Sequence, residues 1–137
     1  MTDTVRSLTT LQTNLADNST RAITPQKLRD AVYSSLGVVP YVSKSANYTA
    51  TENDYVIAVD ATGGQVTITL PAAASTRVGK VYTVKKVDSS GNAVSINPNA
   101  SETLDGSSTT LDITTQYAAI SIVNTGSAWL AISEYTP

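Results

Sequence analysis

The sequence predicts a mainly β protein: an antiparallel β-sandwich or barrel-like domain preceded by a short α-helical N-terminal segment. Three observations predict this fold class. Apolar residues recur at helical spacing up to about residue 40 and at alternate positions after it. About eight short strands then follow one another at roughly ten-residue spacing. Thr and Ser make up 37 of the 137 residues, which suits outward strand positions and turns. We therefore expect a helical segment over residues 1–40 and a β domain over residues 41–137.

Residues 1–40 predict two short helices. The first has one apolar stripe, formed by Val5, Leu8, Leu11 and Leu15. The second begins at Thr24, a helix-capping residue followed by Pro25, and ends at Gly37. Helices this short are marginal on their own in water, and two of them cannot build a core.

We therefore expect this segment to dock on another chain or to oligomerise, with packing against its own β domain as the alternative. The apolar residues expected to make these contacts are Leu8, Leu11, Leu15, Ile23, Leu28 and Val32.

The β domain is predicted from alternating apolar residues bounded by turn formers. Residues 38–45 are expected to form an extended connector, because Pro40 disfavours helical geometry at Val39. Gly63-Gly64 predicts a tight turn, and Thr125-Gly126-Ser127 predicts a hairpin. The expected strands cover residues 47–51, 55–60, 65–70, 80–87, 93–97, 109–114, 117–124 and 128–135, with a brief crossing at 102–106.

Composition excludes several classes of function. The formal net charge is −2 and the pI is about 4.8, so neither a nucleic-acid-coating surface nor a polybasic membrane anchor fits. No secretory signal or membrane-spanning stretch is recognisable. The chain has no Cys and no His, which removes disulfides, thiolate nucleophiles, Cys-ligated zinc and the usual general base. We expect neither an enzyme nor a cofactor or metal site.

The remaining candidates for chemistry are weak. Ser43-Lys44-Ser45 matches a Ser–Lys nucleophile pair in composition only, and residues 88–92 gather oxygen ligands without the spacing of a calcium loop. The densest basic group contains Lys85 and Lys86, which should point to opposite faces of a strand. The seven Tyr residues and Trp129 are candidate sugar-stacking platforms, although a core position is favoured for Trp129. The carboxylates expected in turns and at strand ends are Asp54, Asp60, Asp88, Glu102, Asp105 and Asp112.

Two stretches resemble a known class of proteins. Asp17-Asn-Ser-Thr-Arg-Ala-Ile-Thr-Pro-Gln-Lys-Leu-Arg-Asp-Ala-Val32 resembles a DNxxxxITPxxLRDxV segment near the N-termini of many tailed-bacteriophage structural proteins. Tyr82-Thr-Val-Lys-Lys-Val-Asp-Ser-Ser-Gly-Asn-Ala-Val-Ser-Ile-Asn97, continuing through Glu102-Thr-Leu-Asp-Gly106 to Ser127-Ala-Trp129, resembles the β domain of phage fibre, spike and head-decoration proteins. The two resemblances cover residues 17–32 and roughly 55–133.

The resemblance implies a homotrimeric virion accessory protein, assembled in the bacterial cytoplasm and attached through its N-terminal segment with the β domain outward. Its partners would be further copies of itself and another virion protein such as the major capsid protein. A capsid decoration or head fibre is favoured over a tail fibre or spike subunit, because 137 residues leave no shaft and no separate receptor tip. Host-surface glycans are a further expected partner, and a carbohydrate-binding β-sandwich module is the more distant alternative. The resemblance implies no catalytic residues.

Overall fold

The computed structural model describes residues 39–107 and 109–137. Within them lie nine strands and one short 3-10 helix. In chain order they are β1 (Tyr41–Lys44), β2 (Tyr48–Thr49), β3 (Val56–Val59), β4 (Val66–Thr69), η1 (Ala73–Ser75), β5 (Val81–Lys86), β6 (Val94–Asn97), β7 (Leu111–Ile113), β8 (Ala119–Asn124) and β9 (Trp129–Tyr135). The mainly β class predicted from the sequence is therefore confirmed. The two predicted helices, and the domain boundary expected at residue 40, involve residues 1–38, which lie outside the described residues.

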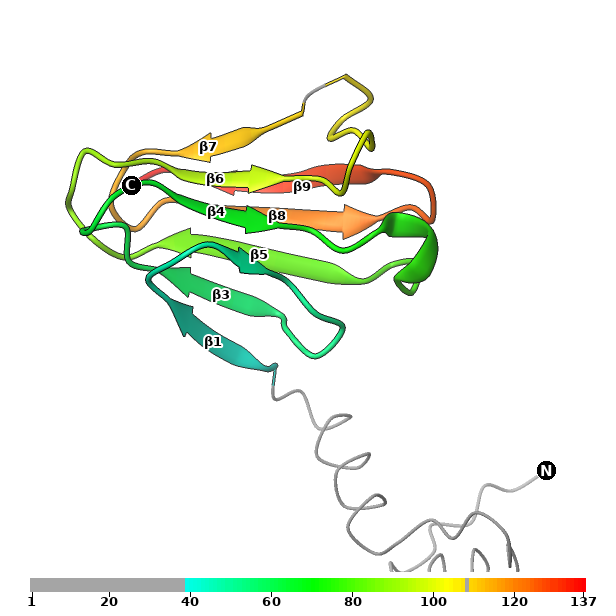
Figure 1. The fold of residues 1–137 in the computed structure, drawn as a ribbon, viewed down its shortest axis with the longest axis horizontal. Helices are drawn as coiled ribbons and strands as arrows, with labels where there is room; N and C mark the ends of the chain where they lie inside the picture. Colours follow the sequence, from blue (N-terminus) through cyan, green and yellow to red (C-terminus); the bar gives the residue numbers. More distant parts are fainter. Residues whose placement is uncertain (1–38, 108) are drawn as a thin grey trace, which may run out of the picture. The chain divides into compact units, whose positions relative to one another are not determined.

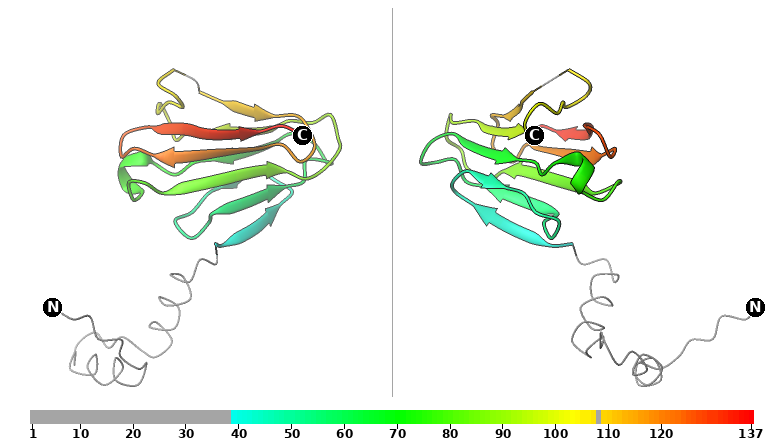
Figure 2. Two further views of the ribbon diagram at one scale, coloured as in Figure 1. Left: turned by 180° about the vertical axis from the view of Figure 1, so that it is seen from behind. Right: turned by 45° about the vertical axis from the view of Figure 1, so that its right-hand side comes forward.

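The strands form two sheets that lie face to face (Figure 1). The five-stranded sheet has the order β1-β3-β5-β8-β9, and the four-stranded sheet has the order β2-β4-β6-β7. The chain crosses from one sheet to the other at each step from β1 to β6, and each turn adds one strand to each sheet. Figure 2 shows the same two layers from behind and in an oblique view. The first six strands thus form three turns of a parallel winding of the kind found in β-helices.

The pairing corrects the prediction of an antiparallel domain. Strands β1, β3 and β5 pair parallel in one sheet, as do β2, β4 and β6 in the other. Only β7, β8 and β9 add antiparallel pairs. The tight turn at Gly63-Gly64 is present, with the Gly64 amide donating to Ala61 O at 3.1 Å, but it carries the chain to the opposite sheet. An alternating strand buries one face in either orientation, so the apolar pattern did not distinguish the two topologies.

One further element differs from the prediction. Tyr41–Lys44, expected within an extended connector, forms edge strand β1, which lies parallel to β3 and is held by its ladder hydrogen bonds. The brief crossing at residues 102–106 places Leu104 in the core, where it forms an isolated bridge with Trp129. The predicted hairpin at residues 125–127 is confirmed, since the Thr125 amide donates to Ala128 O at 3.0 Å.

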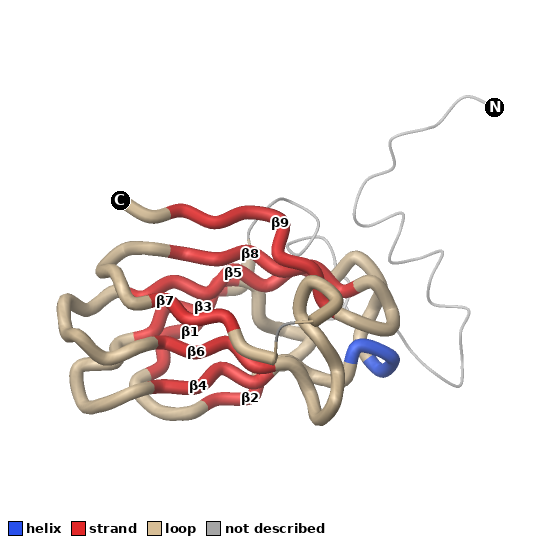
Figure 3. Tube along the Cα trace, turned by 90° about the horizontal axis from the view of Figure 1, so that it is seen from above, coloured by secondary structure: helices blue, strands red, loops and turns tan. Residues whose placement is uncertain are grey.

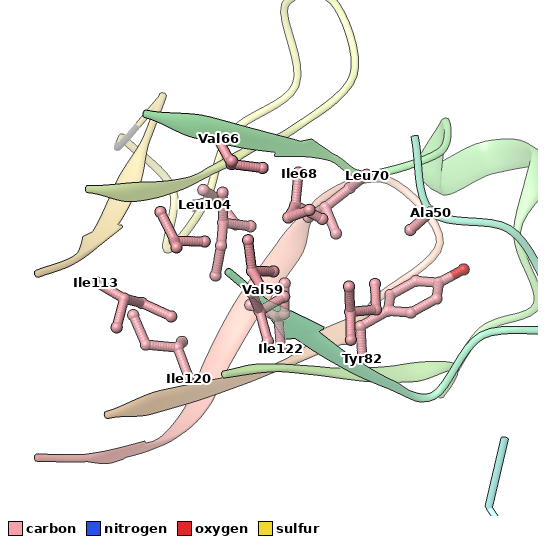
Figure 4. Packing of buried hydrophobic residues seen from close by; sticks show 14 of the residues in the cluster. Ala50, Val59, Val66, Ile68, Leu70, Tyr82, Leu104, Ile113, Ile120 and Ile122 are labelled. Carbon is pink, nitrogen blue, oxygen red and sulfur yellow. The ribbon is translucent and has the colours of Figure 1, made fainter. Parts of the chain in front are cut away.

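The core lies between the two sheets (Figure 4). Val66 and Ile68 point inward from β4 while Thr67 and Thr69 point outward, as the alternation predicted. The chain has no Phe, and the largest buried side chains are Trp129 and Tyr82, whose ring centroids lie 5.6 Å apart. Each buried aliphatic side chain stabilises the fold by roughly 1.5–3 kcal/mol.

Polar contacts fix η1 at the end of the sheets that lies away from the C-terminus (Figure 3). The buried Asn124 side-chain amide donates to Ala73 O at 3.0 Å and to Thr76 O at 2.8 Å. The Glu102 carboxylate accepts from the Ala73 amide at 2.9 Å and from the Trp129 indole at 3.3 Å. These contacts satisfy backbone groups that a loop of small residues would leave unpaired.

Candidate interaction surface

The outward face of the four-stranded sheet is polar at every strand position. Its outward residues alternate with the core residues of β2, β4, β6 and β7. They are Thr49, Thr67, Thr69, Ser95, Asn97 and Asp112. A hydrogen-bonded chain crosses this face: Gln65 Nε2 donates to Ser95 Oγ at 2.7 Å, and Ser95 Oγ donates to Asp112 Oδ1 at 2.6 Å. The outward side chains of this sheet are therefore hydroxyl, amide or carboxyl groups, although Ser95 itself is buried.

The outward face of the five-stranded sheet is different. Of the residues described, the large hydrophobic side chains that are exposed all belong to this sheet or to the segments beside it. They are Val39, Tyr41, Val78, Tyr117, Leu130, Ile132 and Tyr135. Leu130 is 42% exposed and Tyr135 is 57% exposed. Apolar side chains gathered on one face of a soluble protein mark a contact surface.

Strand register orders this face into rows. One row, at the end of the sheet where β5 begins, consists of Val81, Val123 and Leu130. Val78, which lies next to the β8–β9 turn at Gly126, extends this row, and we call the four residues the apolar row. The next row is hydroxylic, and Thr83 Oγ1 lies 2.9 Å from Ser121 Oγ within it. The row at the far end contains Lys85, Ala119 and Tyr135.

This far end carries a cluster of two tyrosines around one ammonium, which we call the tyrosine–lysine cluster: Tyr117, Lys85 and Tyr135. The Lys85 Nζ atom lies 5.9 Å from the ring centroid of Tyr117 and 5.5 Å from that of Tyr135. It also donates a hydrogen bond to Tyr117 O at 2.6 Å. Both tyrosines are more than half exposed. The arrangement presents flat aromatic surface and a positive charge to solvent.

Tyr117 is held in an unfavourable backbone conformation. Its φ angle is +63°, in the left-handed region that costs a residue with a side chain about 1–2 kcal/mol. Hydrogen bonds fix this geometry, because the Tyr117 amide donates to Lys86 O at 2.8 Å and the Lys85 ammonium holds Tyr117 O. Gly or Asn is the usual residue at such a position, so the tyrosine side chain is retained at an energetic cost.

The basic residues named from the sequence separate as expected. Lys85 and Lys86 point to opposite faces of β5, Lys85 to solvent and Lys86 into the interior. Ser43 and Lys44, of the candidate Ser43-Lys44-Ser45, lie in β1, where Ser43 points outward and Lys44 points inward. The Nζ atom of Lys44 lies 3.7 Å from the ring centroid of Tyr48. The alternation of the strand therefore separates the residues of this proposed nucleophile pair.

The oxygen ligands that the sequence gathers at residues 88–92 contact the ammonium of Lys86. Asp88 Oδ1 accepts from the fully buried Lys86 Nζ at 2.7 Å, and Asp88 Oδ2 accepts from the Ala61 amide at 2.7 Å. Burial opposes ionisation of Asp88, but the hydrogen bonds from Lys86, Ser90 and Ala61 outweigh it and hold the pKa of this carboxyl well below its ordinary value. The hydrogen bond from the Ala61 amide to Asp88 fastens the β5–β6 turn to the loop after β3.

A second polar cluster, which sequence reasoning missed, surrounds Asp54. Its Oδ2 atom accepts hydrogen bonds from Tyr48 OH at 2.8 Å and from the Thr51 amide at 2.7 Å. Burial alone would raise the pKa of Asp54, but these hydrogen bonds outweigh it and lower the pKa below its ordinary value. Lys80 donates to Asp54 O, and burial lowers the pKa of its ammonium. Burial raises the pKa of Tyr82 to about 12. Tyr48, Lys80 and Tyr82 all donate to residues 51–54, so the cluster orders this loop.

The carboxylates named from the sequence all accept hydrogen bonds from the protein. Asp60 accepts from the Thr62 amide at 2.9 Å, and Asp105 accepts from the Ala131 amide at 2.9 Å. Asp54, Asp88, Glu102 and Asp112 accept the bonds given above. Asp112 and Glu134 line one shallow cleft between edge strands β7 and β9. Within the described residues no group of three or more His, Cys, Asp or Glu side chains could hold a metal ion.

Trp129 lies in the core, as favoured from the sequence. Its side chain is fully buried, so it offers no stacking surface. The exposed platform comes from Tyr117 and Tyr135 instead, which strand alternation alone did not single out. The six predicted docking residues Leu8, Leu11, Leu15, Ile23, Leu28 and Val32 lie outside the described residues. In the part of the chain that the structure describes, no helix is both long and apolar enough to cross a membrane.

No protein-family model matches this chain, and no curated protein sequence matches it either.

Proposed function

We propose that this chain is a non-enzymatic structural protein of a tailed-phage virion, a homotrimeric capsid-decoration or head-fibre protein. Residues 1–40 attach it to another virion protein such as the major capsid protein, through Leu8, Leu11, Leu15, Ile23, Leu28 and Val32. The β-sandwich-like domain is displayed outward. The resemblance of residues 17–32 and 55–133 to phage structural proteins supports the assignment to a virion.

The contrast between the two outward sheet faces is the observation that carries the proposal. The four-stranded sheet presents hydroxyl, amide and carboxylate groups, whereas the five-stranded sheet carries the apolar row of Val78, Val81, Val123 and Leu130. A lone domain in water gains nothing from such an apolar face, but a subunit that packs against copies of itself does. In the proposed trimer the apolar rows of the five-stranded sheets contact one another, the polar sheets face outward, and the far end of each five-stranded sheet, with Lys85 and Tyr135, stays open to solvent.

The sheet edges support association through the face. Each edge of the five-stranded sheet has a charged residue on its inward side, Lys44 on β1 and Glu134 on β9, and β9 also contains a register shift opposite Ser121 and Ile122. The edges of the four-stranded sheet are only two and three residues long. Short edges, bulges and inward charges all discourage pairing edge to edge.

A tail fibre or spike subunit that contacts the host is the second candidate. The tyrosine–lysine cluster favours it, because exposed rings beside an ammonium suit recognition of a surface ligand. A carbohydrate-binding module, the more distant alternative, would use the same cluster.

The proposal is tested on purified virions of the phage whose genome encodes the chain. We expect mass spectrometry to find the protein in virions, at a copy number divisible by three. A variant with Leu8→Ser, Leu11→Ser and Leu15→Ser should remain in the lysate and be lost from the particles. A matched control with Thr9→Ala, Thr10→Ala and Thr13→Ala, on other faces of the same predicted helix, should be retained. Absence of the protein from virions, or full retention of the triple serine variant, would contradict the proposal.

A further inference from the structure

We propose that the tyrosine–lysine cluster binds a carbohydrate that carries a carboxylate, such as a uronic acid. The inference concerns Tyr117, Lys85 and Tyr135 alone, and it stands whether or not the chain belongs to a virion.

The geometry of the cluster matches the two chemical features of such a sugar. A pyranose ring has apolar C–H faces, and Tyr117 and Tyr135 offer exposed aromatic faces on which those C–H groups can stack. The Lys85 ammonium lies close to both rings, 5.9 Å and 5.5 Å from their centroids. One of its three N–H groups is used by Tyr117 O, which leaves two for a ligand carboxylate.

The charges around the cluster favour an anion. Lys85 is the one charged residue at the outward strand positions of the five-stranded sheet. Among residues 39–107 and 109–137 the single ion pair is Lys86–Asp88, so no described carboxylate neutralises Lys85. The nearest acidic residue along β9 is Glu134, which pairs with the inward-facing Ile120 and lines the cleft toward β7. Glu134 therefore lies on the opposite side of the sheet from a ligand stacked on the rings.

The backbone at Tyr117 is an independent observation. Its left-handed φ of +63° is the conformation in which a glycine would be unstrained, yet a large exposed ring occupies the position. The Tyr117 side chain does not belong to the hydrophobic core, and it is 52% exposed. Strained backbone conformations cluster at functional sites, so an exposed aromatic side chain at a strained position indicates a ligand contact.

The experiment titrates the full chain with a galacturonic acid trisaccharide, a neutral galactose trisaccharide and inorganic phosphate, followed by NMR chemical-shift changes. Trp129 is buried, so its fluorescence is not the signal to use. We expect saturable binding of the acidic trisaccharide, with shifts at residues 85, 117 and 135, and binding of the neutral one weaker by about tenfold, the loss of one charge-assisted contact. Inorganic phosphate should not compete at equal concentration, because it cannot stack.

Three variants separate the parts of the site. Tyr117→Gly removes the ring and relieves the strained φ, so the fold should be kept while affinity falls by about tenfold or more. Lys85→Gln should abolish the preference for the acidic sugar over the neutral one. Glu134→Gln removes a negative charge near the site and should leave the affinity unchanged or raise it.

Tyr41→Ala is the matched control. Tyr41 is 67% exposed on the same face of the sheet but lies on β1, at the opposite edge from Tyr135, so its removal should leave binding unchanged. An equal loss of affinity for the acidic trisaccharide in the Tyr41→Ala and Tyr117→Gly variants would overturn the proposal. It would also be overturned if neither trisaccharide bound, if phosphate competed as well as the acidic sugar, or if Lys85→Gln left the preference intact.

Discussion

At the scale of single residues, one feature that affects stability is the buried pair of Lys86 and Asp88. Lys86 is fully buried, and Asp88 is its partner at 2.7 Å. Taking two charges out of water is costly, so the pair need not stabilise the fold relative to an apolar pair of similar volume. Removing one partner is different, because it leaves the other charge buried and unpaired.

Substitution of Asp88 should therefore be strongly destabilising. We expect Asp88→Ala to lower the free energy of unfolding by about 3 kcal/mol or more, since it strands the Lys86 ammonium and frees the Ala61 amide. Urea denaturation of the two proteins measures the difference. Asp60→Asn, at an exposed carboxylate in the neighbouring turn, is the control and should have a much smaller effect. An equal loss of unfolding free energy in both variants would show that the buried ion pair does not set the cost of removing Asp88.

The same carboxylates predict how stability depends on pH. The pKa values of Asp54 and Asp88 are lowered below the ordinary 3.8 in the folded protein, so below about pH 5 the unfolded chain binds more protons than the folded one. The stabilisation is fully present above the unfolded pKa and is lost as the pH falls through that value toward the folded one. Urea titrations at pH 7, 5 and 3 should show this fall, and Asp88→Asn should flatten it. A flat profile for the unchanged protein would contradict the assignment.

At the scale of elements, the β8–β9 hairpin depends on one glycine. Gly126 has a φ of +97°, and a Cβ atom there would lie 3.0 Å from Val78 Cγ2. Gly91, in the β5–β6 turn, has neither constraint, because a Cβ atom there would have no neighbour within 4 Å and its φ is not in the left-handed region. The two glycines therefore form a matched pair.

Alanine substitutions at these glycines should have opposite effects. We expect Gly126→Ala to lower the free energy of unfolding by about 1–2 kcal/mol, because alanine is strained at this φ and crowds Val78. Gly91→Ala should be neutral or should raise it by up to about 1 kcal/mol through a smaller unfolded-state entropy. Thermal unfolding of both variants measures the difference in stability. A greater loss of stability in Gly91→Ala than in Gly126→Ala would show that the turn geometry is misassigned.

The elements also show what the sequence could and could not predict. The strand positions followed from alternation, because a half-buried strand needs every second residue to be apolar. Strand direction did not, since Val66 and Ile68 face inward whether their neighbour is parallel or antiparallel. Tyr41–Lys44 became a strand through pairing with β3, a contact between distant residues. The tyrosine–lysine cluster was missed for the same reason: Lys85, Tyr117 and Tyr135 meet only once β5, β8 and β9 are side by side.

At the scale of the whole molecule, the two outward faces of the β domain differ in polarity. The outward polar residues explain part of the 37 Ser and Thr side chains that first indicated a β protein. The outward apolar row, by contrast, was not separable in the sequence from core residues, because Val81 and Val123 alternate with polar neighbours like any half-buried position. Only the second sheet, which covers the other face, shows that these valines point away from the core.

A charge placed on the apolar face should therefore disrupt association. Leu130→Glu puts a carboxylate beside Val123 within the apolar row of the proposed contact, so we expect native mass spectrometry to show loss of the trimer. Thr49→Glu, exposed on the polar face, is the matched control and should leave the assembly intact. Circular dichroism should show that both variants keep the β fold. Retention of the trimer by Leu130→Glu would place the contact elsewhere.

The most direct test of the proposed assembly is the mass of the unchanged full chain in solution, measured by light scattering coupled to size-exclusion chromatography. We predict three times the chain mass of 14.3 kDa, because the apolar face and the predicted N-terminal stripe both need partners. A particle of 14.3 kDa that persists as the protein concentration rises would contradict the trimer.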